Sequence, residues 1–398
     1  MTTASTPRTL SFERLAFLGH SANDVYWFIL PVVLPLMISD YNLNYAGAGG
    51  VLSLYLMVVA LFSILFGRLS DSFFPTRLIG IGFIGASAGF LLAASSSTLT
   101  LLNLSLALAA VGVSVFHPAI YGMADAHVQR ARGRFFGRFE SYGSGSVILV
   151  LGISALVLQT YSWRFVIGAA AVPGLAAAYL FLAQPKREAP RPTVSDDGRD
   201  GSLSPWHFGL FLLSSLLRFV SVMAVLSFVP TFLASRGTLP LGAVELVTGA
   251  YFLGGFVGAR TFGRLADRVN PFTLYLGIIL TIPPLVFLFP SAGGPLASVA
   301  VLFLFGGGAI GCIPLQNLLM RRFRSSLRAG HAFGVLLGTM TIAQALSPFL
   351  FGLSADALGL ATSIRVFSIP SVGAVAILVH LSRVVRRATP YLREINLS

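Results

Sequence analysis

Phe66-Gly67-Arg68-Leu69-Ser70-Asp71 returns almost unchanged as Phe262-Gly263-Arg264-Leu265-Ala266-Asp267, 196 residues further along the chain. Three more matches keep nearly this offset: Pro35 with Pro230, Pro118 with Pro314, and residues 132–137 with residues 329–334. Each match is short, but four in the same order, at an offset close to half of the 398 residues, predict an internal duplication. We therefore expect a protein of two related halves.

The composition is that of a protein embedded in a lipid bilayer. Of the residues, 55% are hydrophobic and 10% are charged, whereas soluble domains carry about 25% charged residues. The mean hydropathy is +0.83. Apolar runs long enough to cross a bilayer predict twelve helices. They lie at roughly residues 12–38, 46–66, 78–96, 100–124, 136–159, 163–182, 206–233, 242–262, 272–290, 296–319, 331–356 and 362–382.

The predicted fold is an all-α membrane protein with two pseudo-symmetric six-helix bundles, residues 1–183 and 206–398. Residues 184–205 between them are rich in Pro, Gly, Ser and charge, which predicts a cytoplasmic linker. Because each half has an even number of helices, both halves keep the same orientation in the membrane. Such parallel repeats are found in transporters.

The net charge of +13 invites a nucleic-acid role, but the positions of the charges favour a membrane topology. Most Lys and Arg residues fall in tails, loops and helix ends on one side. Arg164, Arg236 and Arg365 fall on the other side, and Arg218 lies inside a helix. This bias predicts a multi-pass protein of the cell (inner) membrane with both termini cytoplasmic, whose basic residues meet anionic lipid and no nucleic acid. The single cysteine, Cys312, excludes an intramolecular disulfide.

The first predicted helix carries the strongest functional signal. Asp24 would lie ~15 Å inside the membrane, where an ionisable side chain costs ~2.5–3.5 kcal/mol or more. His20 is four residues earlier on the same helix face, and Asn23 and Trp27 lie beside this pair. We expect Asp24, with His20, to bind and release a proton. The alternative is a carboxylate that only holds helices together.

Two further residues are candidates for proton coupling. His117 precedes Pro118, which removes a helix hydrogen bond. His117 could relay a proton or contact substrate, or it could satisfy the carbonyl that the proline frees. Glu140 could titrate in the cavity, or form an ion pair with one of the nearby arginines at the membrane surface.

Arg218 lies near the middle of the seventh predicted helix, at the position that corresponds to Asn23 with an offset of 195. A guanidinium in the membrane needs a partner, and its planar set of donors suits carboxylate, phosphate and phosphonate groups. We therefore expect Arg218 to meet Asp24, another acid or an anionic substrate. A salt bridge to Asp24 could hold the halves together in one state.

Other polar and aromatic residues could line a substrate cavity, although helix-to-helix hydrogen bonding and packing are the alternatives for them. The predicted substrate-binding residues are Asn23, Trp27, Tyr55, Tyr142, Arg218, Gln316, Asn317 and Gln344. No pattern predicts a metal ion, a cofactor or a catalytic residue.

The duplicated segment resembles a loop signature of the major facilitator superfamily. Gly67 to Asp71, followed by Arg77, is similar to the loop between helices 2 and 3, and Gly263 to Arg268 is similar to its copy between helices 8 and 9. In the first copy, Ser72 and Phe74-Pro75 depart from the pattern. The resemblance implies a charge network that gates the cytoplasmic side. Its members would be Gly67, Asp71, Arg77, Gly263, Asp267 and Arg268.

Two stretches resemble a narrower group, the fosmidomycin-resistance family. Gly19-His20-Ser21-Ala22-Asn23-Asp24, with Pro31 and Pro35 after it, is similar to that family's helix 1, and Val115-Phe116-His117-Pro118 to its helix 4. The resemblance implies a monomeric secondary transporter that exports a small molecule or drug by proton antiport. The fifth helix has the glycines of antiporters, Gly143, Gly145 and Gly152, without their proline.

A uniporter or a proton-coupled importer of a small organic anion remains the alternative transport function. A His-Asp pair could also act as a general base in an intramembrane enzyme. The sequence lacks a serine-nucleophile motif and a zinc-protease motif, and the duplicated loops have no role in such an enzyme. We therefore expect no enzymatic activity.

Overall fold

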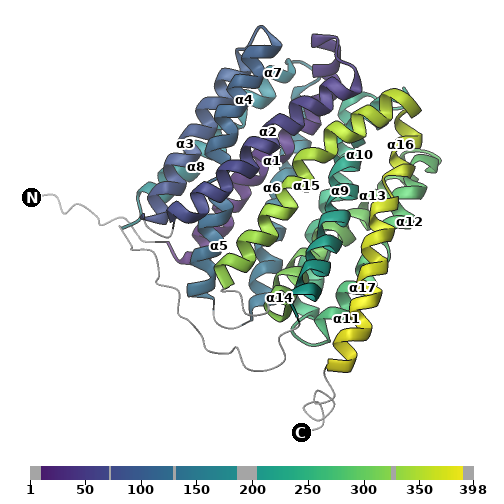
Figure 1. Cartoon of the computed structure of the whole chain (residues 1–398). Helices are drawn as coiled ribbons and strands as arrows, with labels where there is room; N and C mark the ends of the chain where they lie inside the picture. The colour runs from purple at the N-terminus through teal and green to yellow at the C-terminus, as the bar shows by residue number, and fades with distance from the viewer. Residues whose placement is uncertain (1–9, 71–72, 129–130, 186–203, 324–328, 389–398) are drawn as a thin grey trace, which may run out of the picture.

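The computed structural model describes residues 10–70, 73–128, 131–185, 204–323 and 329–388, and throughout these ranges the regular structure is helical (Figure 1). The first half contains α1 (Phe12–Tyr41), α2 (Tyr45–Ser70), α3 (Pro75–Ala94), α4 (Leu99–Val113), α5 (Phe116–His127), α6 (Arg132–Val157), α7 (Trp163–Ala169) and α8 (Ala171–Leu182). The second contains α9 (Pro205–Ser235), α10 (Leu241–Leu265), α11 (Pro271–Ile279), α12 (Ile282–Leu288), the short 3-10 helix η1 (Phe289–Ser291), α13 (Pro295–Gly311), α14 (Ile313–Phe323), α15 (Ala329–Leu358), α16 (Leu360–Val366) and α17 (Ile369–Ala388).

In the described residues these helices form twelve spans that are long and apolar enough to cross a membrane. No span boundary differs from its prediction by more than four residues. The predicted all-α, twelve-span fold is therefore confirmed, and the chain is a multi-pass membrane protein. Most of the predicted linker lies outside the described residues, so the division at 184–205 stays a prediction.

Several spans consist of two helices because a proline interrupts them. In the fourth span, α4 ends at Val113 and α5 begins at Phe116, just before Pro118. Proline has no N–H to donate to the carbonyl four residues earlier, on Ser114. Ser63 Oγ from α2 donates to that carbonyl at 3.2 Å. His117 is thus not needed to satisfy it, and its side chain is left for other contacts.

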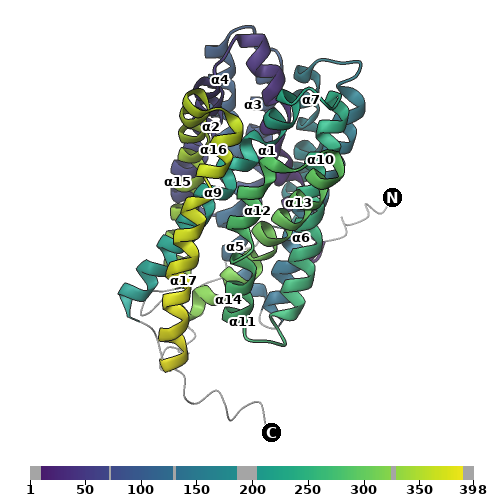
Figure 2. The same ribbon diagram turned by 90° about the vertical axis from the view of Figure 1, so that its right-hand side faces the viewer.

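The two halves meet where α1 packs against α9, α2 against α15, and α6 against both α10 and α14 (Figures 1 and 2). Glycines permit the close approach. A Cβ atom at Gly49 of α2 would overlap the backbone of Pro348, and one at Gly137 of α6 would overlap that of Ala259. We name the end where α1 and α6 begin the near end, and the end where they finish the far end.

Candidate functional site

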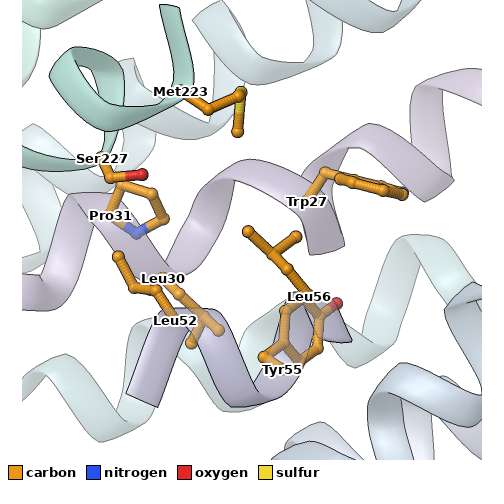
Figure 3. Close-up of a pocket in the computed structure, with 8 residues that line it drawn as sticks. All are labelled: Trp27, Leu30, Pro31, Leu52, Tyr55, Leu56, Met223 and Ser227. Carbon is orange, nitrogen blue, oxygen red and sulfur yellow. The ribbon is translucent and has the colours of Figure 1, made fainter. Parts of the chain in front are cut away.

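A small pocket marks the boundary between the halves beside α1 (Figure 3). Its walls come from α1, α2 and α9, and consist of Trp27, Leu30, Pro31, Leu52, Tyr55, Leu56, Met223 and Ser227. The volume of this cavity is about 10 Å³, which is enough for about one water molecule. Two predicted substrate residues, Trp27 and Tyr55, thus line the boundary, but in this conformation the space is nearly filled. A substrate larger than a water molecule can enter this pocket only if its walls move apart.

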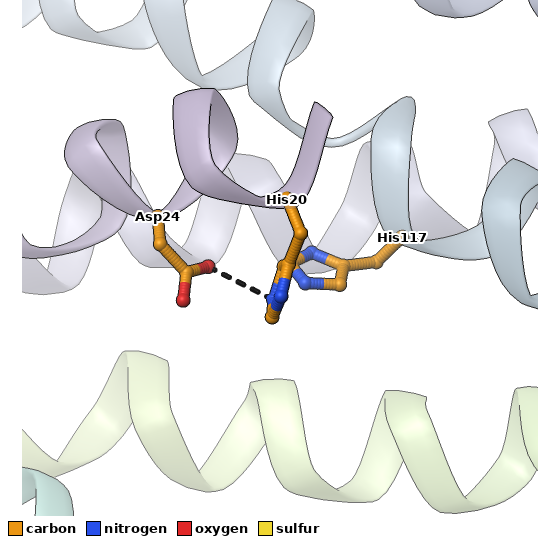
Figure 4. Close-up of side chains that lie close together, drawn as sticks. All are labelled: His20, Asp24 and His117. Atoms are coloured by element: carbon orange, nitrogen blue, oxygen red, sulfur yellow. Dashed lines mark ion pairs between the residues drawn. The ribbon is translucent and has the colours of Figure 1, made fainter. Parts of the chain in front are cut away.

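One turn along α1 from this pocket, three predicted proton-coupling residues come together (Figure 4). His20 Nε2 lies 3.2 Å from Asp24 Oδ1, and His117 of α5 joins them, with one donor atom from each residue within 4.8 Å of the others. His20 is 2% exposed and Asp24 is 9% exposed. The i, i+4 spacing predicted from sequence therefore produces a direct contact in a buried setting.

The hydrogen bonds of His20 fix how many protons the pair holds. Its Nδ1 lies 2.7 Å from the carbonyl oxygen of Phe139. A carbonyl only accepts, so Nδ1 carries a proton and donates it. The contact between Nε2 and Asp24 Oδ1 then requires one more proton, carried by either the imidazole or the carboxyl group. The geometry thus suits a pair that shares a single exchangeable proton.

Packing holds this pair in place. The His20 ring stacks on Phe139 with centroids 3.8 Å apart and planes 8° apart. On the same helix, a Cβ at Gly143 would overlap the Asp24 carboxylate. Glycine at this position of α6 therefore makes the space in which His20 and Asp24 meet.

His117 is oriented by α1. Asn23 Nδ2 lies 3.3 Å from His117 Nδ1, and the Trp27 ring meets the imidazole at 81° with centroids 5.7 Å apart. Asn23 is fully buried, and its Oδ1 has no partner among the described residues. The amide thus holds His117 beside the pair.

Glu140 links this cluster to the second half. Tyr121 of α5, one turn after His117, donates to Glu140 Oε1 at 3.4 Å. Glu140 is 7% exposed and close enough to His20 for their charges to interact. Across the boundary, the Asn317 side chain of α14 reaches the Tyr121 hydroxyl. Among the described residues Glu140 makes no ion pair with the arginines of α6, which was the alternative for this residue.

The side chains of His20, Asp24 and His117 would have to move closer together before they could bind a metal ion. Zinc with bonds of about 2.0–2.1 Å in a tetrahedral site needs its ligand atoms about 3.3 Å apart. The His20–Asp24 contact meets this value, but the set as a whole spreads to 4.8 Å. The hydrogen bonds described above already suit the two histidines as proton carriers.

Arg218 occupies a different environment from the one we expected. It is 1% exposed inside the second half, donates to the Ala309 carbonyl at 3.2 Å and to Gln316 Oε1 at 2.5 Å, and lies over the Phe219 ring. Within the described residues it makes no ion pair, so the salt bridge to Asp24 is not formed in this conformation. Gln316 is buried with it and donates to the sulfur of Met340 at 3.0 Å.

The remaining predicted substrate residues lie apart. Tyr142 is 37% exposed and stacks on Phe17, away from the buried cluster. Tyr55 is buried, and its hydroxyl donates to the Tyr26 carbonyl at 3.0 Å. Gln344 of α15 is half-buried, and its amide oxygen accepts no hydrogen bond from the described residues.

The predicted gating residues lie at the near end. Gly263 of α10 packs on the α6 backbone at Gly133, where the Asp267 carboxylate also approaches. In the first copy, Gly67 lies beside Pro118, and Asp71 falls outside the described residues. Arg77 and Arg268 are exposed. The second copy thus lies where the two halves pack against each other at the near end, and its gating role stays a prediction.

Three notable residues were absent from the sequence-based site. Tyr121 lies between Glu140 and the Asn317 side chain of the second half, and its position four residues after His117 was the available signal. Glu245 is an acid within the eighth span and is fully buried. Asp356 of α15 accepts from the N–H groups of Tyr45 and Ala46 at 3.0 and 2.9 Å, so it caps α2 of the other half at the far end. Its partners are backbone groups, which no residue pattern reveals.

Comparison with known proteins agrees with the fold. A family model described as Major Facilitator Superfamily matches residues 16–348. Solved structures with similar folds include the nucleoside transporter NupG (TM-score 0.74, 13% identity, 93% of this chain and 99% of that one) and FucP in its outward conformation (0.65, 16%, 92% and 97%).

A bacterial homologue of the human lysosomal transporter Spinster, in an inward-facing and occupied state, gives a TM-score of 0.73 at 16% identity and covers 93% of this chain and 96% of that one. Curated relatives match over shorter stretches. SVOPL of Homo sapiens is 22% identical over 161 residues, which are 40% of this chain and 33% of that protein. The class H tetracycline resistance protein of Pasteurella multocida is 28% identical over 121 residues, 30% of each. The chain spans about a third of the length of these two relatives.

Proposed function

The chain belongs to the Major Facilitator Superfamily and is a transporter of a small-molecule substrate, and from this premise we propose that it exports its substrate in exchange for protons. The halves would alternate access to a central cavity. The substrate would be a drug-like compound, as the sequence resemblance to fosmidomycin-resistance proteins and the partial similarity to a tetracycline resistance protein suggest. The termini would be cytoplasmic, in the cell membrane, and the protein would act as a monomer.

One observation carries the proposal: His20 Nε2 and Asp24 Oδ1 lie 3.2 Å apart in a buried contact, one turn along α1 from the pocket between the halves, with a geometry that suits a shared proton. An ionisable pair in a membrane interior is costly and marks a proton or substrate pathway by default. When the pair gains or loses a proton, its net charge changes by one unit. Any movement of the halves that changes how far the pair is exposed to water is then linked to the charge of the pair. Such a link is what proton coupling requires.

The surrounding residues have separate roles in this proposal. His117 and Glu140 flank the pair and would pass protons between it and the near end. Trp27, Tyr55 and Asn317 would contact substrate once the halves separate. Arg218 and Gln316 are sealed inside the second half, so in this conformation they support the helices that face the cavity rather than the substrate.

Transport by purified protein in liposomes that enclose a pH-sensitive dye tests the proposal. A gradient of fosmidomycin, then of a small panel of cationic drugs, should move protons in the native protein and at least about tenfold less in Asp24→Asn. Asp40→Asn is the matched control, because Asp40 lies on the same helix but pairs with Arg164 at the far end, 2.6 Å away.

Two outcomes would contradict the proposal. Labelled substrate that exchanges equally in all three proteins without proton movement would establish a uniporter. Accumulation of a small organic anion together with protons would establish the importer. Loss of transport in Asp40→Asn as well would show that Asp24→Asn reports on folding, and the assignment of Asp24 would be withdrawn.

A further inference from the structure

Glu245 is a buried acid that the proposed mechanism does not use. It lies in the first turns of α10 and has 0% exposure. Neither oxygen of its carboxyl group has a hydrogen-bond partner in the part of the chain that the structure describes. Every other buried acid in the site described above has at least one polar contact. Glu245 therefore stands out as an acid without a structural reason for its position.

The helix register places Glu245 between the two halves. Gly242, three residues earlier, packs against the Ala155 carbonyl of α6, and Gly249, four residues later, packs against Leu151 of the same helix. Residues three before and four after share a face with the residue between them. Glu245 thus lies on the α6-facing side of α10, near the far end. We name Leu151, Ala155, Gly242, Glu245 and Gly249 the far-end seam.

The charged groups on the helices around α10 either lie far from this seam or make contacts with other residues. On α6 the nearest residue whose side chain is ordinarily charged at neutral pH is Glu140, eleven residues before Leu151, or ~16 Å along the helix, and Tyr142, nine residues before Leu151, stacks on Phe17. On α9, Arg218 is turned toward Ala309 and Gln316, and beyond its end Arg236 donates to the Ala292 carbonyl. On α13 no residue is ionisable.

The remaining neighbours of α10 give the same result. α1 reaches α10 through Phe28, which contacts Phe252 two turns beyond Glu245, and its His20 and Asp24 are paired with each other. α14 packs toward the near end of α10, where Arg264 and Asp267 lie. Among the described residues, therefore, no cation faces Glu245.

A carboxylate ion in such a place would lack both a counter-ion and hydrogen-bond donors, and its burial would cost several kcal/mol. The uncharged acid avoids most of this cost. Separation of α6 from α10 at the far end would expose Glu245 to water, where an ordinary glutamate is ionised at neutral pH. The closed and open seams therefore favour different protonation states of one residue.

We propose that Glu245 is a second proton site of this transporter, which binds a proton when the far-end seam closes and releases it to water when the seam opens. The inference rests on the proposed alternation of the two halves. It adds a site in the second half, on the side opposite the near end, that is independent of His20 and Asp24. One proton moves between the carboxyl oxygen and water, and no other bond changes.

The width of the seam, measured as a function of pH, tests this inference without any substrate. Spin labels would be attached to cysteines at Thr160 and Thr238, two exposed far-end positions in opposite halves, with Cys312→Ser as background. Pulsed distance measurements in nanodiscs at pH 5 to 8 give the ratio of closed to open molecules. A closed state that binds one more proton loses population as pH rises, by up to about tenfold per pH unit.

Glu245→Gln keeps the shape of the uncharged acid and cannot ionise, so this pH dependence should disappear and the seam should stay closed. Glu245→Leu should behave in the same way, which covers the case in which the glutamine variant fails to fold. Glu13→Gln is the control, because Glu13 is a largely exposed acid at the near end. All proteins are measured with and without Asp24→Asn, so that titration at the central pair is separated.

An unchanged pH dependence in both Glu245 variants would overturn the inference. If Asp24→Asn loses proton-coupled transport but its seam still depends on pH through Glu245, the two proton sites are independent. The same conclusion follows if a Glu245 variant loses the pH dependence of the seam while transport still depends on Asp24. The distance measurement does not depend on transport. Its result can therefore be interpreted even if the proposed export function is wrong.

Discussion

The same position in the duplicated fold holds Asn23 in the first half and Arg218 in the second, and the two surroundings differ in kind. Asn23 orients His117 beside the His20–Asp24 pair, in a cluster whose Asp24 and His117 retain some exposure. Arg218 is 1% exposed and makes its contacts with an amide and a backbone carbonyl. In the proposed mechanism, the position in the first half lies beside groups that gain and lose protons, whereas the equivalent position in the second half holds a charge that is fixed.

The difference follows from the chemistry of the side chains. Histidine and aspartate change charge within the ordinary pH range, and a proton must be able to reach them. Arginine stays charged in proteins, so its burial is tolerable only where dipoles surround it. Duplication thus supplied two equivalent positions, of which, in the proposed mechanism, the first belongs to the exchange site and the second is an internal support.

Replacement of Arg218 is the strongest test of this contrast. Arg218→Met keeps the volume but leaves Gln316 Oε1 and the Ala309 carbonyl without donors, at about 1–3 kcal/mol each, so we expect a loss of about 2–6 kcal/mol in the free energy of unfolding. Asn23→Leu at the equivalent position should cost less, about 1–2 kcal/mol, since one weak contact is lost. Thermal unfolding in detergent gives both values.

The opposite result would change the assignment of Arg218. A stable Arg218→Met protein that no longer binds substrate would make the guanidinium a ligand group, which becomes exposed in another conformation. The contrast between an exchange site and a support would then be wrong.

The fold was predictable because its determinants are local and repeated. Twelve apolar runs and the segment from Phe66 to Asp71 with its copy at Phe262 to Asp267 were sufficient for the span count and architecture. The His20–Asp24 contact was also predictable, since it depends only on helix periodicity. These features need no knowledge of which helices become neighbours.

Contacts between distant helices were not predictable. The environment of Arg218 depends on the approach of α13 and α14, and the capping of α2 depends on Asp356 from α15. Glu245 was not singled out from the sequence, because the burial of this acid near a helix end results from packing between α10 and its neighbours. Burial of a polar side chain is decided by tertiary packing, which a single sequence does not contain.

Gly143→Ala tests the exchange site at its closest contact. The added methyl group would overlap the Asp24 carboxylate, so we expect a loss of about 1–3 kcal/mol in stability and at least about tenfold less proton-coupled transport. Gly152→Ala on the same helix is the control, because nothing lies within 4 Å of its added Cβ. That variant should be as stable as the native protein or more so, by up to about 1 kcal/mol. Equal transport in both variants would mean that the His20–Asp24 contact is not needed for coupling.

The smallest expected effect concerns the contact that joins the two surroundings. Tyr121 of α5 and Asn317 of α14 are equivalent positions, again 196 residues apart, and their side chains meet across the boundary. A double-mutant cycle with Tyr121→Phe and Asn317→Leu should give a coupling energy of about 0.5–1.5 kcal/mol in thermal unfolding, within the range of side chains that lie in contact.

Tyr121→Phe also removes the hydrogen bond from Tyr121 to Glu140. This loss occurs in both the single and the double variant that carry Tyr121→Phe, so it does not contribute to the coupling energy. Tyr121→Phe combined with Gln344→Leu is the reference, and these two changes should be additive within about 0.5 kcal/mol. A coupling near zero would mean that Tyr121 and Asn317 do not help to hold the halves together. A coupling in the expected range would mean that the first half senses the position of the second through the approach of Asn317 to Tyr121, beside Glu140, so that separation of the halves at the near end changes the surroundings of an ionisable group.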